Sequence, residues 1–141
     1  MKTHPAGPTL QEGAGAALRV FFRLIVPGWT FGEDEQARLL GVPLWQLAEL
    51  RAAAEASDLV PLPDATLARL GFLVAIHASL TRIFGEPSRG NAWIWEPNPL
   101  PLFGGATPRA RLLAAAADGV DPASSWAAVL RSLDGADGNG F

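Results

Sequence analysis

Residue types that carry catalytic or metal chemistry are sparse in this chain. It has two histidines, His4 and His77, and no cysteine, so no thiolate metal site and no cysteine nucleophile can form. The carboxylates are not spaced to complete a metal site with either histidine, and the sequence contains no phosphate-binding glycine loop and no recognisable serine, histidine and aspartate set. We therefore expect no enzyme, no catalytic residue, no metal and no cofactor, and we interpret His77 as an ordinary residue of an apolar helix.

Residues 33–51 have the spacing of a helix-turn-helix, a motif that can recognise DNA. Small, glycine and apolar residues stand where that motif needs them: Ala37, Gly41, Val42, Leu47 and Leu50. The exposed start of the second helix would present Trp45, Gln46 and Arg51, of which only Gln46 suits a base edge and only Arg51 is cationic. With a net charge of −3, the whole chain also lacks the positive charge that DNA binding requires. We expect weak DNA binding by the chain alone.

Aromatic residues and prolines gather in the last third of the chain. Trp93, Trp95 and Trp126 surround a connection rich in proline and glycine, and a chain of 141 residues with five tryptophans and seven phenylalanines has difficulty covering them all. At least one of these three tryptophans is expected in the core. Tryptophan and arginine dominate the energetics of protein interfaces, and Arg109 and Arg111 would supply a charged rim. These residues indicate a protein-binding surface.

The elements that must position these residues are helices. The length allows one domain, and 49% hydrophobic with 18% charged residues is typical of a globular protein. Apolar residues recur at helical spacing and nowhere alternate, which predicts an all-α fold of about seven helices around a long central one. The expected helices are residues 14–26, ended by Pro27 and Gly28; 33–40, ended by Gly41; Pro43 to about Ala56; about twenty residues from an N-cap at Asp64 to Phe84, before Gly85; 88–95; one from Thr107-Pro108 to Gly119; and one from Asp121-Pro122 to Gly135.

The ends of the chain lack helical periodicity. We expect a flexible arm over residues 1–11, a helix-turn-helix bundle over 12–62, a central helix and binding unit over 63–134, and a flexible tail over 135–141. The sequence has neither the apolar stretch of a signal peptide nor a run of about 18 apolar residues, which favours a cytoplasmic protein outside the membrane.

A series of short motifs runs through the second half of the chain in a fixed order: Trp93-Ile94, Pro97-Asn98-Pro99, Gly104-Gly105, Thr107-Pro108, Leu112-Leu113, Gly119 and Val129-Leu130. This order resembles the C-terminal toxin-binding domain of the Xre/MbcA/ParS-like antitoxins. The likeness covers about residues 64–134, and the segment 33–51 resembles the Xre-like N-terminal part of that family. Ile94 replaces the usual leucine, and the connection from Pro99 to Gly104 is about two residues longer than is typical.

The resemblance implies an antitoxin of a type II toxin-antitoxin pair, which binds a RES-domain toxin that destroys NAD and covers the active site of that toxin. The residues expected to shape the toxin contact are Trp93, Asn98, Pro99, Gly104, Gly105, Thr107, Pro108, Arg109, Arg111 and Phe141. The acidic tail, with Asp134, Asp137 and the chain carboxylate, would cover or enter a cationic cleft.

Two further expectations concern other partners. A homodimer within a hetero-oligomeric complex is expected, because the N-terminal apolar helices and Trp29, Phe31 and Trp45 offer surface for it. Autorepression of the operon would add operator DNA as a partner. The alternative function is a helix-turn-helix transcriptional regulator that binds DNA as a dimer through Trp45, Gln46 and Arg51.

Overall fold

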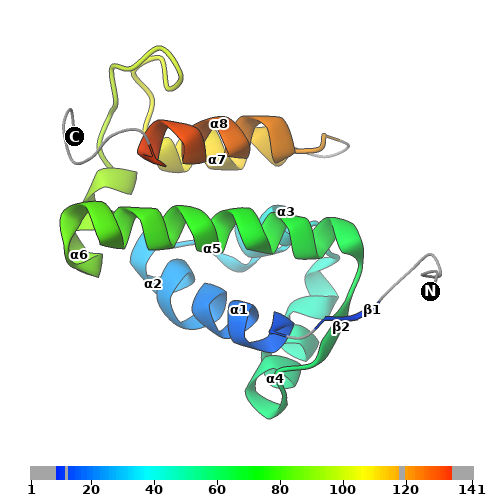
Figure 1. The fold of residues 1–141 in the computed structure, drawn as a ribbon. Helices are drawn as coiled ribbons and strands as arrows, with labels where there is room; N and C mark the ends of the chain where they lie inside the picture. Colours follow the sequence, from blue (N-terminus) through cyan, green and yellow to red (C-terminus); the bar gives the residue numbers. More distant parts are fainter. Residues whose placement is uncertain (1–8, 12, 118–119, 135–141) are drawn as a thin grey trace, which may run out of the picture.

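The computed structural model describes residues 9–11, 13–117 and 120–134, which form helices and one small pair of strands (Figure 1). In chain order the elements are β1 (Thr9–Gln11), α1 (Ala14–Val20), η1 (Phe21–Ile25, a π-helix), α2 (Val26–Trp29), α3 (Glu33–Leu40), η2 (Leu44–Gln46, a 3-10 helix), α4 (Leu47–Ala56), β2 (Val60–Leu62), α5 (Asp64–Phe84), α6 (Pro87–Ile94), α7 (Pro108–Ala115) and α8 (Ala123–Asp134). With α1, η1 and α2 taken as one continuous helix and η2 as the start of α4, this part of the chain has seven helices, which confirms the all-α prediction. Several predicted features lie outside the described residues: His4, Gly119, Gly135, Asp137, Phe141, the arm up to residue 8 and the tail over 135–141.

The first helix continues past the predicted stop at Pro27 and Gly28. It ends at Trp29, where Thr30 adopts a left-handed conformation with φ 57°. A proline inside an α-helix removes a hydrogen bond and crowds the carbonyl four residues earlier. Here the wider π turn of η1 comes directly before Pro27, and the Val26 N–H donates to the Phe21 carbonyl five residues back. We attribute the continuation to this wider turn, which relieves the crowding.

Gly28 has a packing role within that helix. A Cβ at this position would lie 2.6 Å from Nδ2 of Asn91 on α6. The close approach allows Nε1 of Trp29 to donate to Oδ1 of Asn91 at 3.0 Å. The glycine that was expected to stop the helix therefore brings α2 and α6 together.

A strand pair was not predicted. β1 lies within the expected N-terminal arm and pairs antiparallel with β2, with Thr9 opposite Leu62 and Gln11 opposite Val60. Three-residue strands are too short to show alternation in a sequence. Their pairing joins the start of the chain to the segment before α5.

α5 is the central helix, as predicted. In Figure 1, α7 and α8 lie on one side of it, and α1, α2 and α4 lie on the other. Asp64 is its first helical residue rather than its N-cap, which is Pro63, and Gly85 ends it with φ 83°. By length and composition alone α5 could also cross a membrane, which the sequence analysis did not anticipate. In this fold it packs against α1, α6 and α8.

Most of the other predicted helix ends agree closely with the structure, but α7 ends at Ala115 and not at the predicted Gly119, because the backbone leaves the helical conformation at Ala116, and α8 begins at Ala123, one residue after the predicted Pro122. α3 has the expected bounds and ends at Gly41 with φ 72°, and Oγ1 of Thr107 accepts a hydrogen bond from the Ala110 N–H at the start of α7. Pro43 is an exception, because it precedes η2 in an extended conformation instead of occupying the first turn of a helix. The buried side chains of both predicted units form one continuous hydrophobic cluster.

Candidate protein-binding site

The loop that connects α6 to α7, residues 95–107, is closed by one buried residue, Asn98. The Asn98 N–H donates to the Ala106 carbonyl at 3.0 Å, and the Asn98 carbonyl accepts from the Gly105 N–H at 2.9 Å. Its Oδ1 accepts from the Leu100 N–H at 3.0 Å, as in the short turns that asparagine stabilises. These bonds join the two ends of the 95–107 loop.

The tip of the 95–107 loop is anchored by Phe103. Its buried ring meets the ring of Trp93 edge to face, with 5.7 Å between centroids. After it the chain turns through Gly104 and Gly105, at φ 58° and 89°, a conformation that side chains disfavour. The N–H groups of Phe103 and Gly104 both donate to the Leu100 carbonyl at 2.9 Å. The loop therefore has a defined shape.

Arg109, near the start of α7, binds the base of the 95–107 loop to the end of the first helix. Its Nε donates to the Trp29 carbonyl at 2.8 Å, and its Nη2 donates to the Thr30 carbonyl at 2.7 Å and to Oε1 of Glu35 at 2.8 Å. Its guanidinium also lies over the ring of Trp95, 4.6 Å from the centroid. Arg109 is thus engaged within the chain and is not the free rim charge that the sequence suggested.

The outer side of the 95–107 loop is mostly apolar, with Glu96 as an exposed charged residue. Trp95 is 46% exposed and Leu100 is 38% exposed. Three prolines of the loop are exposed beside them: Pro97, Pro99 and Pro101. We call these five residues the loop patch. Exposed aromatic and aliphatic groups on a rigid support are typical of protein interfaces.

The structure separates the predicted toxin contacts into inner and outer residues. Those turned inward, or engaged in holding the loop and α7 in place, are Trp93, Asn98, Thr107, Pro108 and Arg109. Those exposed are Pro99, Gly104, Gly105 and Arg111, and the Arg111 side chain makes no hydrogen bond or ion pair with the part of the chain that is described. The exposed residues Trp95 and Leu100 were not among the predicted toxin contacts, although Trp95 was one of the three tryptophans that indicated a binding surface. The spacing of Gly90, Trp93 and Ile94 along α6 was the available signal, because it leaves Trp95 off the buried stripe.

The expectation that at least one of Trp93, Trp95 and Trp126 lies in the core is confirmed, because Trp93 and Trp126 are both buried. Trp126 is fully buried on α8, and its Nε1 donates to the Leu112 carbonyl at 3.1 Å. Trp29 and Phe31, which were expected to offer dimer surface, are 0% and 5% exposed, so that expectation is wrong for both. Trp45 is 68% exposed, so it alone of the three residues named for a dimer is available to a partner.

The candidate DNA-binding residues at the start of α4 do not form a cationic surface. Arg51 is partly buried: its guanidinium lies 4.8 Å from the centroid of the Phe22 ring, and its Nη2 donates to Oε1 of Gln36 at 3.4 Å. Gln46 is half-buried, and Glu49 is exposed on the same helix. An exposed carboxylate without a free cation beside it opposes contact with phosphates.

The charged residue at the end of α8 is bound to the central helix. Oδ1 of Asp134 accepts a hydrogen bond from Oγ of Ser79 at 3.1 Å and pairs with Nη2 of Arg82 at 3.4 Å. Asp134 thus has partners within the chain, although the sequence analysis grouped it with a tail that enters the toxin. Asp134, the last residue that the structure describes, therefore lies beside the C-terminal half of α5.

His77 belongs to the core of the protein. It is buried on α5, its ring centroid is 6.1 Å from that of Trp29, and burial lowers its pKa. Among residues 9–11, 13–117 and 120–134, no three acidic or histidine side chains gather where they could hold a metal ion.

A comparison with models of protein families, with curated proteins and with solved structures finds no match for this chain.

Proposed function

We propose that this protein is a non-enzymatic inhibitor that binds another protein through the loop patch, and that it acts as the antitoxin of a type II toxin-antitoxin pair. Its partner is a RES-domain toxin that degrades NAD, and binding blocks access of NAD to that toxin. The protein works in the cytoplasm, as a homodimer within the hetero-oligomeric complex.

The observation that carries this proposal is the exposed indole of Trp95 on a rigid base. A half-exposed tryptophan leaves apolar surface in contact with water in the free protein. When a partner covers that surface, its burial contributes strongly to the binding free energy. Arg109 stacks on its ring, while the bonds of Asn98 and the burial of Phe103 hold the adjacent backbone. Because the loop is already ordered, little conformational entropy is lost when a partner binds.

Inhibition in this proposal needs no chemistry from the antitoxin. The loop patch supplies apolar contact area, and the exposed side chain of Arg111, without a partner in the described part of the chain, supplies a positive charge on α7. The segment after Asp134 carries one further acid and a terminal aromatic residue, Asp137 and Phe141, suited to a cationic pocket that accepts a dinucleotide.

The proposal requires that a RES-domain protein be encoded beside the gene of this chain, and the test uses that protein. We expect the two proteins to co-purify as a stable complex after co-expression, and we expect NAD consumption by the toxin to stop when the antitoxin is in excess. Deletion of residues 135–141 should weaken inhibition more than it weakens binding. Continued NAD consumption in the presence of saturating full-length chain would contradict the proposal.

Operator binding is not proposed as a separate function of the chain alone. Arg51 is engaged with Phe22 and Gln36, and Glu49 is exposed on the same helix. A gel-shift assay of the chain alone and of the complex tests this directly. We expect no shift for the chain alone at physiological salt.

A further inference from the structure

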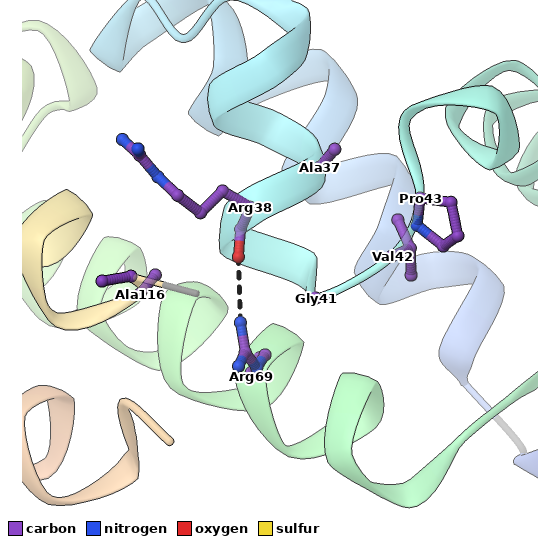
Figure 2. A pocket seen from close by; sticks show the side chains of 8 residues that line it. Ala37, Arg38, Gly41, Val42, Pro43, Arg69 and Ala116 are labelled. Carbon is purple, nitrogen blue, oxygen red and sulfur yellow. Dashed lines mark hydrogen bonds between the residues drawn. The ribbon is translucent and has the colours of Figure 1, made fainter. Parts of the chain in front are cut away.

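A pocket of about 410 Å³ lies between the end of α3, the first half of α5 and the end of α7 (Figure 2). Its lining combines small and apolar residues with two arginines: Ala37, Arg38, Gly41, Val42, Pro43, Arg69, Ala116 and Ala117. Among the residues that the structure describes, no acidic side chain belongs to this lining. We call it the two-arginine pocket.

Arg69 enters the pocket from α5 and is held in one position. Its Nη1 donates to the carbonyl of Arg38 at 2.9 Å and to that of Leu39 at 3.4 Å, and its Nη2 donates to that of Val120 at 3.3 Å. Its guanidinium lies so close to Gly41 that a Cβ there would be 3.0 Å from Cζ. An arginine has five N–H donors, so these three bonds leave two for a ligand.

Arg38 approaches the pocket from α3. In Figure 2 its side chain extends from α3 away from Arg69 and would have to turn toward that residue to share a ligand with it. It is exposed and makes no hydrogen bond or ion pair with the residues that the structure describes. Two guanidinium groups at one pocket repel each other, and the backbone carbonyls bound by Arg69 offset only part of the charge.

We propose that the two-arginine pocket binds a small aliphatic anion that carries a phosphate group or two carboxylates, with Arg38 and Arg69 as its ligands. The volume is within the range of small-molecule sites. The remaining lining is aliphatic, with Val42 and Pro43 on one side and Ala116 on the other, and it contains no aromatic ring on which a nucleobase could stack. The proposal is independent of the antitoxin function, because the pocket includes no residue of the loop patch.

The test is an NMR titration of the full-length chain at constant ionic strength. The two probes are glycerol 3-phosphate and glutarate, and the observed signals are the backbone amides of Gly41, Ala116 and Ala117. We expect saturable shifts with one probe or both, and the tighter probe identifies the anion class. Arg38→Ala should weaken that affinity about tenfold, as expected for loss of a charged hydrogen-bond donor.

The controls separate the site from general charge effects. Arg131→Ala removes an exposed cation of α8 outside the pocket and should leave the affinity unchanged. Arg69→Lys should weaken binding, with circular dichroism used to verify that the chain is folded. The proposal fails if neither probe saturates, if Arg38→Ala binds like the original chain, if chloride alone produces the same shifts, or if only a DNA duplex perturbs these amides.

Discussion

The guanidinium of Arg109 lies 4.6 Å from the centroid of the Trp95 ring. The same group donates hydrogen bonds to the carbonyls of Trp29 and Thr30. One side chain thus connects the exposed tryptophan of the loop patch to the end of the first helix. Trp95 is thus supported, through Arg109, by Trp29 and Thr30, which lie about 65 positions earlier in the chain. If the loop patch binds a partner as proposed, stability and partner binding are coupled at this arginine.

Arg109→Ala removes the ion pair with Glu35 and leaves two backbone carbonyls without their donor. We expect the free energy of unfolding to fall by about 3 kcal/mol, because the side chain of Arg109 is only 15% exposed. Urea unfolding followed by tryptophan fluorescence measures this change. Arg111→Ala, on the exposed side of the same helix, should change stability by less than about 0.5 kcal/mol. Equal effects of the two substitutions would refute the role assigned to Arg109.

Asn98→Ala removes the acceptor for the Leu100 N–H inside the 95–107 loop. The lost hydrogen bond should cost about 1 kcal/mol of stability. Hydrogen exchange should show faster exchange at the amides of Leu100 and Gly105, with α8 unchanged. Unaltered exchange in the loop would mean that Asn98 does not hold it closed.

Two helical glycines, Gly15 and Gly71, allow a controlled test of helix packing, because only one of them lies against another segment. A Cβ on Gly15 of α1 would lie 2.0 Å from the Ser57 carbonyl oxygen, whereas one on Gly71 of α5 would meet nothing within 4 Å. Gly15→Ala should destabilise the fold by about 3 kcal/mol, since two backbone segments must separate. Gly71→Ala should stabilise it by up to about 1 kcal/mol through helix propensity. Thermal unfolding of the two variants should therefore shift in opposite directions.

The buried imidazole of His77 should make stability depend on pH. Burial lowers its pKa in the folded chain below the ordinary value of 6.5, so only the unfolded chain takes up a proton as the pH first falls below that value. The contribution of neutral His77 is complete above about pH 6.5 and is lost as the pH falls toward the folded pKa. Urea unfolding at pH 7.5 and 5.5 should show a larger loss for the original chain than for His77→Gln. Identical losses would contradict this assignment.

Local signals in the sequence predicted most helix ends, and tertiary contacts decided the remainder. Some helix ends depend only on local residues and could therefore be predicted: the start of α7 at Thr107 and Pro108, and the ends of α3 and α5 at Gly41 and Gly85. Pro27 could not be interpreted correctly, because a π turn has no sequence pattern comparable to that of a helix cap.

The candidate site was predicted as a region, but the roles of its residues were not. The Trp-Pro motifs identified the 95–107 loop, yet which tryptophan faces outward depends on how α6 packs. Arg109 resembled a rim residue because the sequence does not show that α7 lies against the end of α2 and the start of α3. Glu35 and Trp29, its partners, are far from it in the chain.

The most direct measurement of the central claim compares the two most exposed tryptophans by calorimetric titration against the RES-domain toxin that the proposed function requires. Trp95→Ala should raise the Kd about 30-fold or more, the effect of removing an interface hot spot. Trp45→Ala, which removes an indole that is 68% exposed at the start of α4, should leave the Kd of a preformed antitoxin dimer within about twofold. If Trp95→Ala binds as tightly as the original chain, the loop patch is not the binding surface.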